Sequence, residues 1–183
     1  MEKSTEIYYS GIGSRNTPPS ILEIMKSIAA RLAKEGWTLR SGGAPGADTA
    51  FEVGCDSVQG SKQIFLPWKG FNGNKSPFYN IPSEAFEISL EAYGERLTYM
   101  KRPIKLLMAR NVLQVLGHTL DEPSGLVVCW TPDGAINASE RTKKTGGTGQ
   151  AISIASRYGV PVFNLARHDF DDIDNFINTY DFE

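Results

Sequence analysis

The feature that most constrains the fold of this chain is a glycine-rich turn placed between a strand-like run and a helix-like run. The turn, residues 146–151 with sequence GGTGQA, follows the apolar run 126–130 and opens the helix-like run 151–157. A glycine turn that opens a helix leaves backbone N–H groups unpaired, and the helix dipole adds partial positive charge there. A second glycine-rich turn, residues 41–48, has the same setting earlier in the chain. Two such turns predict a pocket for a phosphate-bearing ligand on an α/β sheet.

Short apolar runs alternate with helix-like segments along the chain. Strands are predicted at residues 7–11, 37–40, 63–66, 126–130 and 160–164. Helices are predicted between Ser20 and Gly36, after Pro45, and at residues 83–93, 104–116, 151–157 and 171–180. This alternation implies a mainly parallel sheet covered on both faces, so the fold class is a Rossmann-like α/β three-layer sandwich. We predict one domain over residues 1–183, with an acidic C-terminal helix within 169–183.

Local signals refine the first two helices. Ser20 and Glu23 have capping-box spacing, which predicts the start of the first helix. Ile24 and Ile28 belong to an apolar stripe on that helix, which predicts the face that it buries. Pro45 suits the first turn of the second helix.

Charge is distributed unevenly. The formal net charge is −2, but the six acids of residues 169–183 stand without any Lys or Arg, so residues 1–168 carry a net charge of +4. The remaining chain has two groups of cations: Arg96, Lys101, Arg102, Lys105 and Arg110, and then Arg141, Lys143 and Lys144. Cations near the glycine turns favour an anionic ligand. The excess is too small to indicate nucleic acid by itself.

Hydropathy and cysteine content predict a cytoplasmic protein without membrane contact. No apolar run reaches the ~20 residues that a membrane span needs. Residues 1–4 lack the apolar segment of a secretory signal. Cys55 and Cys129 fit reduced core thiols better than a disulfide framework.

The turn after the first predicted strand contains Gly11, Gly13 and Arg15. It lacks the third glycine of a dinucleotide fingerprint, and no acid follows at the expected spacing of ~20 residues, so classical nicotinamide binding is not expected. The glycines have two interpretations. They permit a tight strand-to-helix turn, or they bring the backbone to a phosphate, to which Arg15 would add bidentate contacts. The turn at 41–48 has neither the lysine nor the spacing of a P-loop, which excludes a Walker-type ATPase.

Three charged residues are candidates for chemistry. Asp48 and Glu52 lie one helical turn apart and share a face near the start of their predicted helix. One interpretation is that they hold ribose hydroxyls and assist chemistry at the anomeric carbon. The other is that Asp48 complements the helix dipole while Glu52 is solvated. Arg110 is flanked by apolar sequence and therefore needs a partner, either a carboxylate or a ligand phosphate.

No metal site and no cofactor are predicted. His118 and His168 lack metal-ligand spacing, and the cysteines lie far from both in sequence. The chain has no nucleophile elbow or other triad signature. Trp68 and Trp130 close apolar strands, where core packing is the default role and base stacking is the alternative.

These motifs together resemble the Rossmann-like superfamily (SLOG) that contains DNA processing protein A (DprA) and the lonely-guy (LOG) nucleotide hydrolases. Gly13-Ser14-Arg15 is similar to the first turn of DprA, and residues 41–48 (SGGAPGAD) are similar to its second, typically SGxAxGID. Residues 109–113 resemble an Arg-Asn-Arg-Ile-Ile helix start, with Val112 replacing the second Arg. Residues 147–163 are similar to the last loop–helix–strand unit.

The resemblance is closer to the small DprA-like proteins of bacteriophages, on residues 66–72, 110–117 and 128–134. It implies a nucleotide pocket, a homodimer and, for a phage protein, the cytoplasm of the host cell. The catalytic glutamate of LOG enzymes falls on Ile152, so an enzyme would need Asp48, Glu52 or Glu140 instead. The predicted catalytic residues are Glu52, Asp48 and Arg110, and the predicted binding residues are Gly13, Ser14, Arg15, Ser41, Gly42, Gly43, Gly46, Asn111, Gly146, Gly147, Thr148, Gly149 and Gln150.

Three functions are compatible with these residues. The main hypothesis is a protein that binds a nucleotide through phosphate and ribose and hydrolyses or exchanges the N-glycosidic bond of a nucleoside monophosphate. The alternative is a DprA-like protein that binds single-stranded DNA in phage recombination or replication, with steep salt dependence. The third is a non-catalytic protein that senses or sequesters a nucleotide signal, which the presence of Ile152 favours.

Overall fold

A parallel five-stranded sheet of order β3-β2-β1-β4-β5 organises the computed structural model, which describes residues 6–181. The strands are β1 (Ile7–Gly11), β2 (Trp37–Ser41), β3 (Lys62–Ile64), β4 (Leu126–Cys129) and β5 (Val162–Asn164). The α-helices are α1 (Pro19–Lys34), α2 (Ala47–Asp56), α3 (Ser83–Tyr93), α4 (Arg102–Leu116), α5 (Thr148–Arg157) and α6 (Phe170–Thr179). Short 3-10 helices lie at Phe71–Gly73, Glu95–Tyr99, Ala138–Glu140 and Lys143–Thr145.

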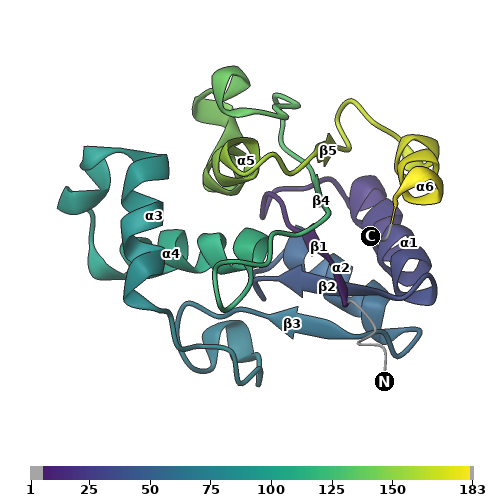
Figure 1. Ribbon diagram of the computed structural model, residues 1–183, viewed down its shortest axis with the longest axis horizontal. Coiled ribbons are helices and arrows are strands. Elements are labelled where there is room, and N and C mark those ends of the chain that lie inside the picture. The colour runs from purple at the N-terminus through teal and green to yellow at the C-terminus, as the bar shows by residue number, and fades with distance from the viewer. Residues whose placement is uncertain (1–5, 182–183) are drawn as a thin grey trace.

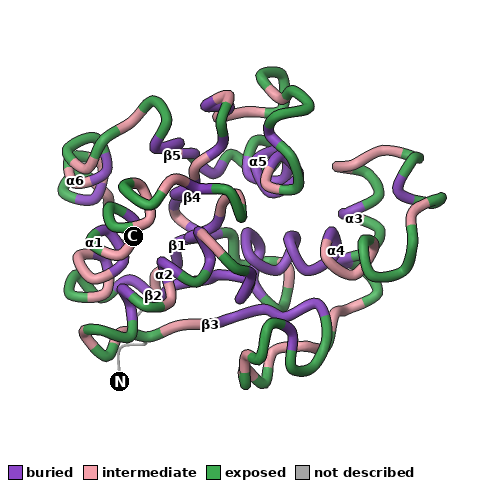
Figure 2. The backbone as a smooth tube through the Cα atoms, turned by 180° about the vertical axis from the view of Figure 1, so that it is seen from behind, coloured by how far each residue is buried: buried purple, intermediate pink, exposed green. Residues whose placement is uncertain are grey.

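Both faces of the sheet are covered, as the alternation of strands and helices predicts. Along β4, Leu126 and Val128 point into a core shared with α1, α2 and α6. The intervening Val127 and Cys129 point into a second core shared with α4 and α5. Figure 1 shows α1 and α6 together on one side of the sheet and α3 with α4 on the other. The buried stretches of backbone in Figure 2 follow the central strands and the second half of α4. The predicted α/β Rossmann-like class is therefore confirmed.

The order of the strands creates a switch point between β1 and β4. The chain moves outward from β1 through β2 to β3, and it then returns by way of α3 and α4 to place β4 on the other side of β1. Crevices at the carboxyl ends of strands on either side of such a reversal are where open α/β sheets bind ligands. Every predicted glycine turn of this chain follows the carboxyl end of β1, β2 or β4.

Several local predictions need correction. The helix α1 begins at Pro19 with Pro18 as its N-cap and without a side-chain cap, because Ser20 already lies inside the first turn. The predicted stripe is confirmed at Ile28, which is buried, but it is wrong at Ile24, which is 38% exposed while Met25 is buried. Pro45 lies before α2, whose N-cap is Gly46.

The remaining element boundaries shift by a few residues, and the helix α5 starts at Thr148, within the glycine turn itself. The predicted acidic helix corresponds to α6, and residues 182 and 183 of the acidic segment lie outside the described residues. Both cysteines are buried and unpaired, as predicted. Over residues 6–181, none of the helices combines the length and apolar character needed to cross a membrane.

Candidate functional site

A pocket of about 560 Å³ opens at the switch point, where the loops that follow β1 and β4 meet the side of α4 and the start of α5. This volume lies in the range of small-molecule sites. The lining combines four cationic side chains, a carboxyl group and three side-chain amides with backbone of the glycine turn. The residues that line it are Ile12, Gly13, Ser14, Arg15, Asn16, Ala44, Asp48, Leu107, Met108, Arg110, Asn111, Gln114, Pro132, Lys143, Lys144, Thr145, Gly146, Gly147, Thr148 and Ala151.

Arg110 is the buried cation of this pocket. Its guanidinium is 4% exposed, and Nη1 donates hydrogen bonds to the carbonyl oxygens of Gly42 and, at 3.2 Å, Phe65. Burial lowers the pKa of Arg110, while the nearby carboxyl of Asp48 opposes that shift. The guanidinium also lies over the ring of Phe71, with 5.7 Å between Cζ and the ring centroid. The sequence predicted a carboxylate or a ligand phosphate as the partner of Arg110. In the structure its hydrogen-bond partners are backbone carbonyl oxygens, and these hydrogen bonds hold the side chain in place.

Asp48 lies at the first turn of α2 and is 4% exposed. Its carboxyl accepts a hydrogen bond from the backbone N–H of Ala44 at 3.2 Å. Desolvation raises the pKa of Asp48 to about 6, against the opposing pull of Arg110, the Ala44 N–H and Arg15. A carboxyl group with such a pKa exchanges protons near neutral pH, which is a property typical of functional sites.

Two amide side chains of α4 complete the interior. Asn111 Nδ2 donates to the Gly147 carbonyl oxygen at 3.4 Å and so connects α4 with the glycine turn. Gln114 is 2% exposed, and its Nε2 has no hydrogen-bond partner within residues 6–181. The sequence analysis missed Gln114. Helical periodicity could have identified it, because residues 110 and 114 lie one turn apart on the same face of the helix.

The rim of the pocket is positively charged. Arg15, Lys143 and Lys144 are exposed, and within the described chain none of them forms an ion pair with a carboxylate. Gly147 and Thr148 are the N-cap and first residue of α5. The first N–H groups of a helix lack intrahelical acceptors, and the dipole favours an anion at that end. The rim therefore presents both side-chain and backbone donors to an anion.

Asp133, in the loop after β4, holds the cationic segment in place. Its carboxylate accepts hydrogen bonds from the hydroxyls of Thr131 at 2.8 Å, Thr142 at 2.7 Å and Thr145. Partial burial by itself would raise the pKa of Asp133, but these three hydrogen bonds and the N–H of Ala135 keep it well below its ordinary value. Because Thr142 and Thr145 flank Lys143 and Lys144, the ionised Asp133 fixes where the two lysines stand. The sequence analysis did not identify this residue.

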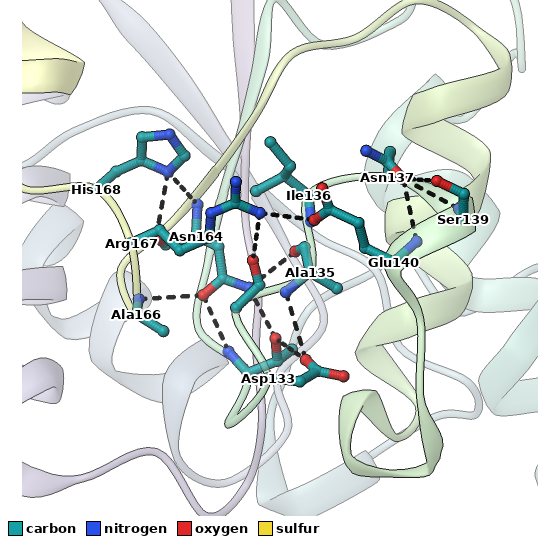
Figure 3. Close-up of polar contacts among 12 residues, drawn as sticks. Asp133, Ala135, Ile136, Asn137, Ser139, Glu140, Asn164, Ala166, Arg167 and His168 are labelled. Atoms are coloured by element: carbon teal, nitrogen blue, oxygen red, sulfur yellow. Dashed lines mark hydrogen bonds and ion pairs between the residues drawn. The ribbon is translucent and has the colours of Figure 1, made fainter.

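A second set of hydrogen bonds anchors the same loop to β5, as Figure 3 shows. Asn164 is fully buried, and its Nδ2 donates to Thr131 Oγ1 at 2.7 Å and to the carbonyl oxygen of Ala135 at 2.9 Å. Glu140 accepts from Arg167 at 2.6 Å and from the N–H of Ile136 at 3.1 Å. The wall of the pocket formed by the loop after β4 is thus tied to the sheet.

The structure brings most predicted site residues together, and their roles stay predictions. Lining the pocket are Gly13, Ser14, Arg15, Asp48, Arg110, Asn111, Gly146, Gly147 and Thr148. Outside the lining are Ser41, Gly42, Gly43, Gly46, Glu52, Gly149 and Gln150.

Some of the residues outside the lining support it. Ser41 donates to the Gly11 carbonyl oxygen at 2.6 Å, and Gln150 Nε2 donates to Ser89 Oγ at 2.7 Å, which joins α5 to α3. Gly46 has a φ of +85°, and a Cβ there would lie 2.8 Å from the carbonyl oxygen of Arg15, so only glycine allows the first two turns to meet.

Glu52 lies in a different setting. It forms an ion pair with Lys62, with 2.9 Å between Oε1 and Nζ, and it accepts from Asn74 Nδ2 at 3.0 Å. Neither tryptophan that was a candidate for base stacking lines the pocket, since Trp68 packs edge-on against Phe71 and Trp130 packs against the α1–α2 side of the core. In the described part of the chain, no three His, Cys, Asp or Glu residues are grouped as a metal site requires.

Comparisons with known proteins support the fold rather than a function. No protein-family model matches the chain, and no curated protein matches it in sequence. Among solved structures, DNA processing protein A from Helicobacter pylori, described for its single-stranded DNA binding mode, matches with a TM-score of 0.57 at 20% identity. That match covers 94% of this chain and 79% of the H. pylori chain.

DNA processing protein A (DprA) from Streptococcus pneumoniae matches with a TM-score of 0.42 at 12% identity, over 97% of this chain and 62% of that one. The likeness to the H. pylori structure shows that this chain has a DprA-like Rossmann fold.

Proposed function

We propose that this protein, which has a DprA-like fold, binds single-stranded DNA at the pocket between β1 and β4. The observation that carries the proposal is the rim, where three exposed cations that form no ion pair within residues 6–181 line the pocket together with the N-terminus of α5. A phosphodiester supplies the acceptor oxygens that such donors require. The similar H. pylori protein is described as binding single-stranded DNA, which supports the same ligand here.

The surroundings of the pocket favour a strand over an isolated anion. Leu107 and Met108 of α4 line the pocket, and the exposed Lys101 and Arg102 lie at the start of the same helix. A strand that leaves the rim along the first half of α4 would meet further cations at its phosphates. Single-stranded DNA bound in this way depends steeply on salt, because each neutralised phosphate releases counterions.

A titration of fluorescent single-stranded DNA over a range of salt concentrations tests the proposal. Each neutralised phosphate of a single strand contributes about −0.7 to the slope of the logarithm of the association constant against the logarithm of the salt concentration. Three rim contacts therefore predict a slope of about −2. Arg15→Ala or Lys144→Ala should reduce the steepness by roughly one contact. Lys34→Ala is the matched control. Lys34 is the last residue of α1, which starts near the carboxyl end of β1 and runs antiparallel to it, so Lys34 lies at the end of the strands away from the pocket. Absence of binding at low salt and micromolar protein refutes the proposal.

A nucleoside monophosphate is a second candidate ligand for the same pocket. The observation that favours it is the buried carboxyl of Asp48 in the lining of this pocket of about 560 Å³, because contacts to phosphate alone do not require a carboxyl group. Mass spectrometry of the ligand that the purified protein retains tests this candidate. A retained nucleotide that is displaced by single-stranded DNA would place both ligands at one site.

Hydrolysis of the N-glycosidic bond would have to depend on Asp48. Ile152, at the position of the LOG glutamate, is fully buried in the core. Glu52 is held by Lys62 and Asn74, and Glu140 is paired with Arg167, both outside the pocket lining. Incubation with a panel of ribo- and deoxyribonucleotides, followed by chromatography for free base, tests this chemistry. Release of base that Asp48→Asn abolishes supports it, and binding without release supports a sensor.

A further inference from the structure

The two ends of the molecule carry opposite charge. Residues 95–105, which form a 3-10 helix and the start of α4, contain four cations and one acid. Residues 169–181, in and beside α6, contain five acids without any Lys or Arg. Figures 1 and 2 place α3 and the start of α4 at one end of the longest dimension and α1 with α6 at the other. Each copy of the protein therefore presents a cationic end and an acidic end that cannot meet within that copy.

The acidic end contains an apolar groove of about 510 Å³ between α1 and the turn that enters α6. Ile24 of α1 lines this groove together with Leu165 and Phe170. Ile24 is 38% exposed, so the groove leaves an isoleucine of a well-packed helix in contact with water. An exposed apolar surface with charged residues around it is typical of a site that another molecule covers.

Acids beside the groove are available to an external cation. Glu23 lines the groove and is paired with Lys26 of its own helix at 2.7 Å. Asp169, Asp171 and Asp172 form no ion pair within residues 6–181. The groove therefore favours an apolar side chain that arrives with cations on either side of it.

The cationic end presents such a side chain. Tyr99 is 87% exposed, and Ile104, which follows it in the first turn of α4, is 37% exposed. Lys101 and Arg102 lie between them in sequence, are exposed and form no ion pair with any described residue. Tyrosine and arginine are the residues that most often anchor a protein interface, where the aromatic ring fills a pocket and charges lie around it.

We propose that the protein associates head to tail, with Tyr99 of one copy in the groove beside Ile24 of a second copy. The cations of residues 95–105 would then face the acids of residues 169–181 across the contact. A two-fold dimer through either end would bring like charges together, so the charges favour a contact between two different surfaces. Such a contact leaves one unused surface at each end of a pair, and its repetition builds a chain of copies. This inference does not depend on the proposed DNA binding.

Sedimentation velocity over about 5 to about 500 µM protein tests the association, because a contact of this size is weak. The protein is freed of DNA first, since Lys101 and Arg102 also lie on the path proposed for the strand. We expect the weight-average mass to rise with concentration at low salt. The association should weaken several-fold between about 50 and about 300 mM salt, because salt screens exposed charges.

Two variants each disable one surface and leave the other intact. Tyr99→Asp retains the groove, and Ile24→Lys retains the cationic end. Each variant alone should stay monomeric, whereas an equal mixture of the two should form pairs and no larger species. Val53→Lys, at an apolar position of α2 that is 47% exposed, is the matched control and should associate like the unmodified protein.

The mixture separates this contact from other forms of association. An unmodified protein that stays monomeric at about 500 µM in low salt overturns the inference. Association that either variant retains alone overturns the assignment to Tyr99 and Ile24. If both variants are monomeric and their mixture does not pair, the contact does not join two different surfaces. Thermal unfolding verifies that both variants are folded, and pairing in the mixture requires that they are.

Discussion

The guanidinium of Arg110 occupies the space that a side chain at Gly42 would need. A Cβ at Gly42 would lie 2.6 Å from Arg110 Cζ and would overlap Nη1, which donates to the carbonyl oxygen of the same glycine. The loop after β2 can therefore approach α4 only because position 42 has no side chain. Through this contact, a residue outside the pocket lining determines where the buried cation of the pocket stands.

Gly42→Ala should destabilise the protein by about 1–3 kcal/mol, because a methyl group must displace a fully packed, hydrogen-bonded guanidinium. Urea unfolding measures the change. Gly147→Ala is the control, since its backbone has an ordinary helical φ of −64° and a Cβ there meets only Met108 Cε, at 3.6 Å. Equal stability of the two variants would contradict the packing role of Gly42.

The fold could be predicted from the sequence because its strands, helices and turns follow from local patterns of apolar residues and glycines. Alternating apolar runs and glycine turns identified β1, β4 and α3, and the rule for strand ends brought Arg15, Asp48 and Gly147 to one pocket. The capping box at Ser20 failed because the chain enters α1 through Pro18 and Pro19, which supply the helical φ without a side-chain cap.

What the sequence could not predict depends on contacts between distant segments. Glu52 shares a helical face with Asp48, but Lys62 and Asn74 approach from β3 and the loop beyond it and bind its carboxylate. Asp133 was not identified from the sequence, because its role depends on Thr142 and Thr145, which fold back on it. Such pairings, over separations of 9 to 22 residues that cross loops, leave no periodic signal.

Asp133→Asn should release the segment that carries Lys143 and Lys144. The amide replaces a charged acceptor of three hydroxyl groups, and loss of charge-assisted hydrogen bonds destabilises the local structure by about 1–3 kcal/mol. Hydrogen exchange should accelerate in residues 142–148, and affinity for single-stranded DNA should fall several-fold. Asp121→Asn, which removes the same charge from an exposed position, is the control. Unchanged exchange in residues 142–148 would contradict the anchoring role.

Glu52→Gln should leave ligand binding unchanged within about twofold, because its carboxylate pairs with Lys62 outside the pocket lining. The loss of this partly exposed ion pair should cost at most about 1 kcal/mol of stability. Affinity for single-stranded DNA and for a nucleoside monophosphate, measured beside Asp48→Asn, checks the expectation. A large loss of binding by Glu52→Gln alone would restore Glu52 as a candidate site residue.

The contribution of Asp48 to the stability of the protein should fall as the pH rises from about 4 to about 6. Desolvation holds the pKa of Asp48 at about 6 in the folded protein against an ordinary value of 3.8, although Arg110 and Arg15 favour ionisation and Glu52 disfavours it. Between these pH values the folded state binds more protons than the unfolded state, so folding is favoured on the acid side of the window.

Asp48→Asn removes this titration while preserving the shape of the side chain. Relative to the unmodified protein, the variant should therefore gain stability between pH 4 and pH 7, by up to about 3 kcal/mol. Urea unfolding at both pH values measures the difference. If the unfolding free energies of the two proteins run parallel from pH 4 to pH 7, Asp48 does not titrate in this window.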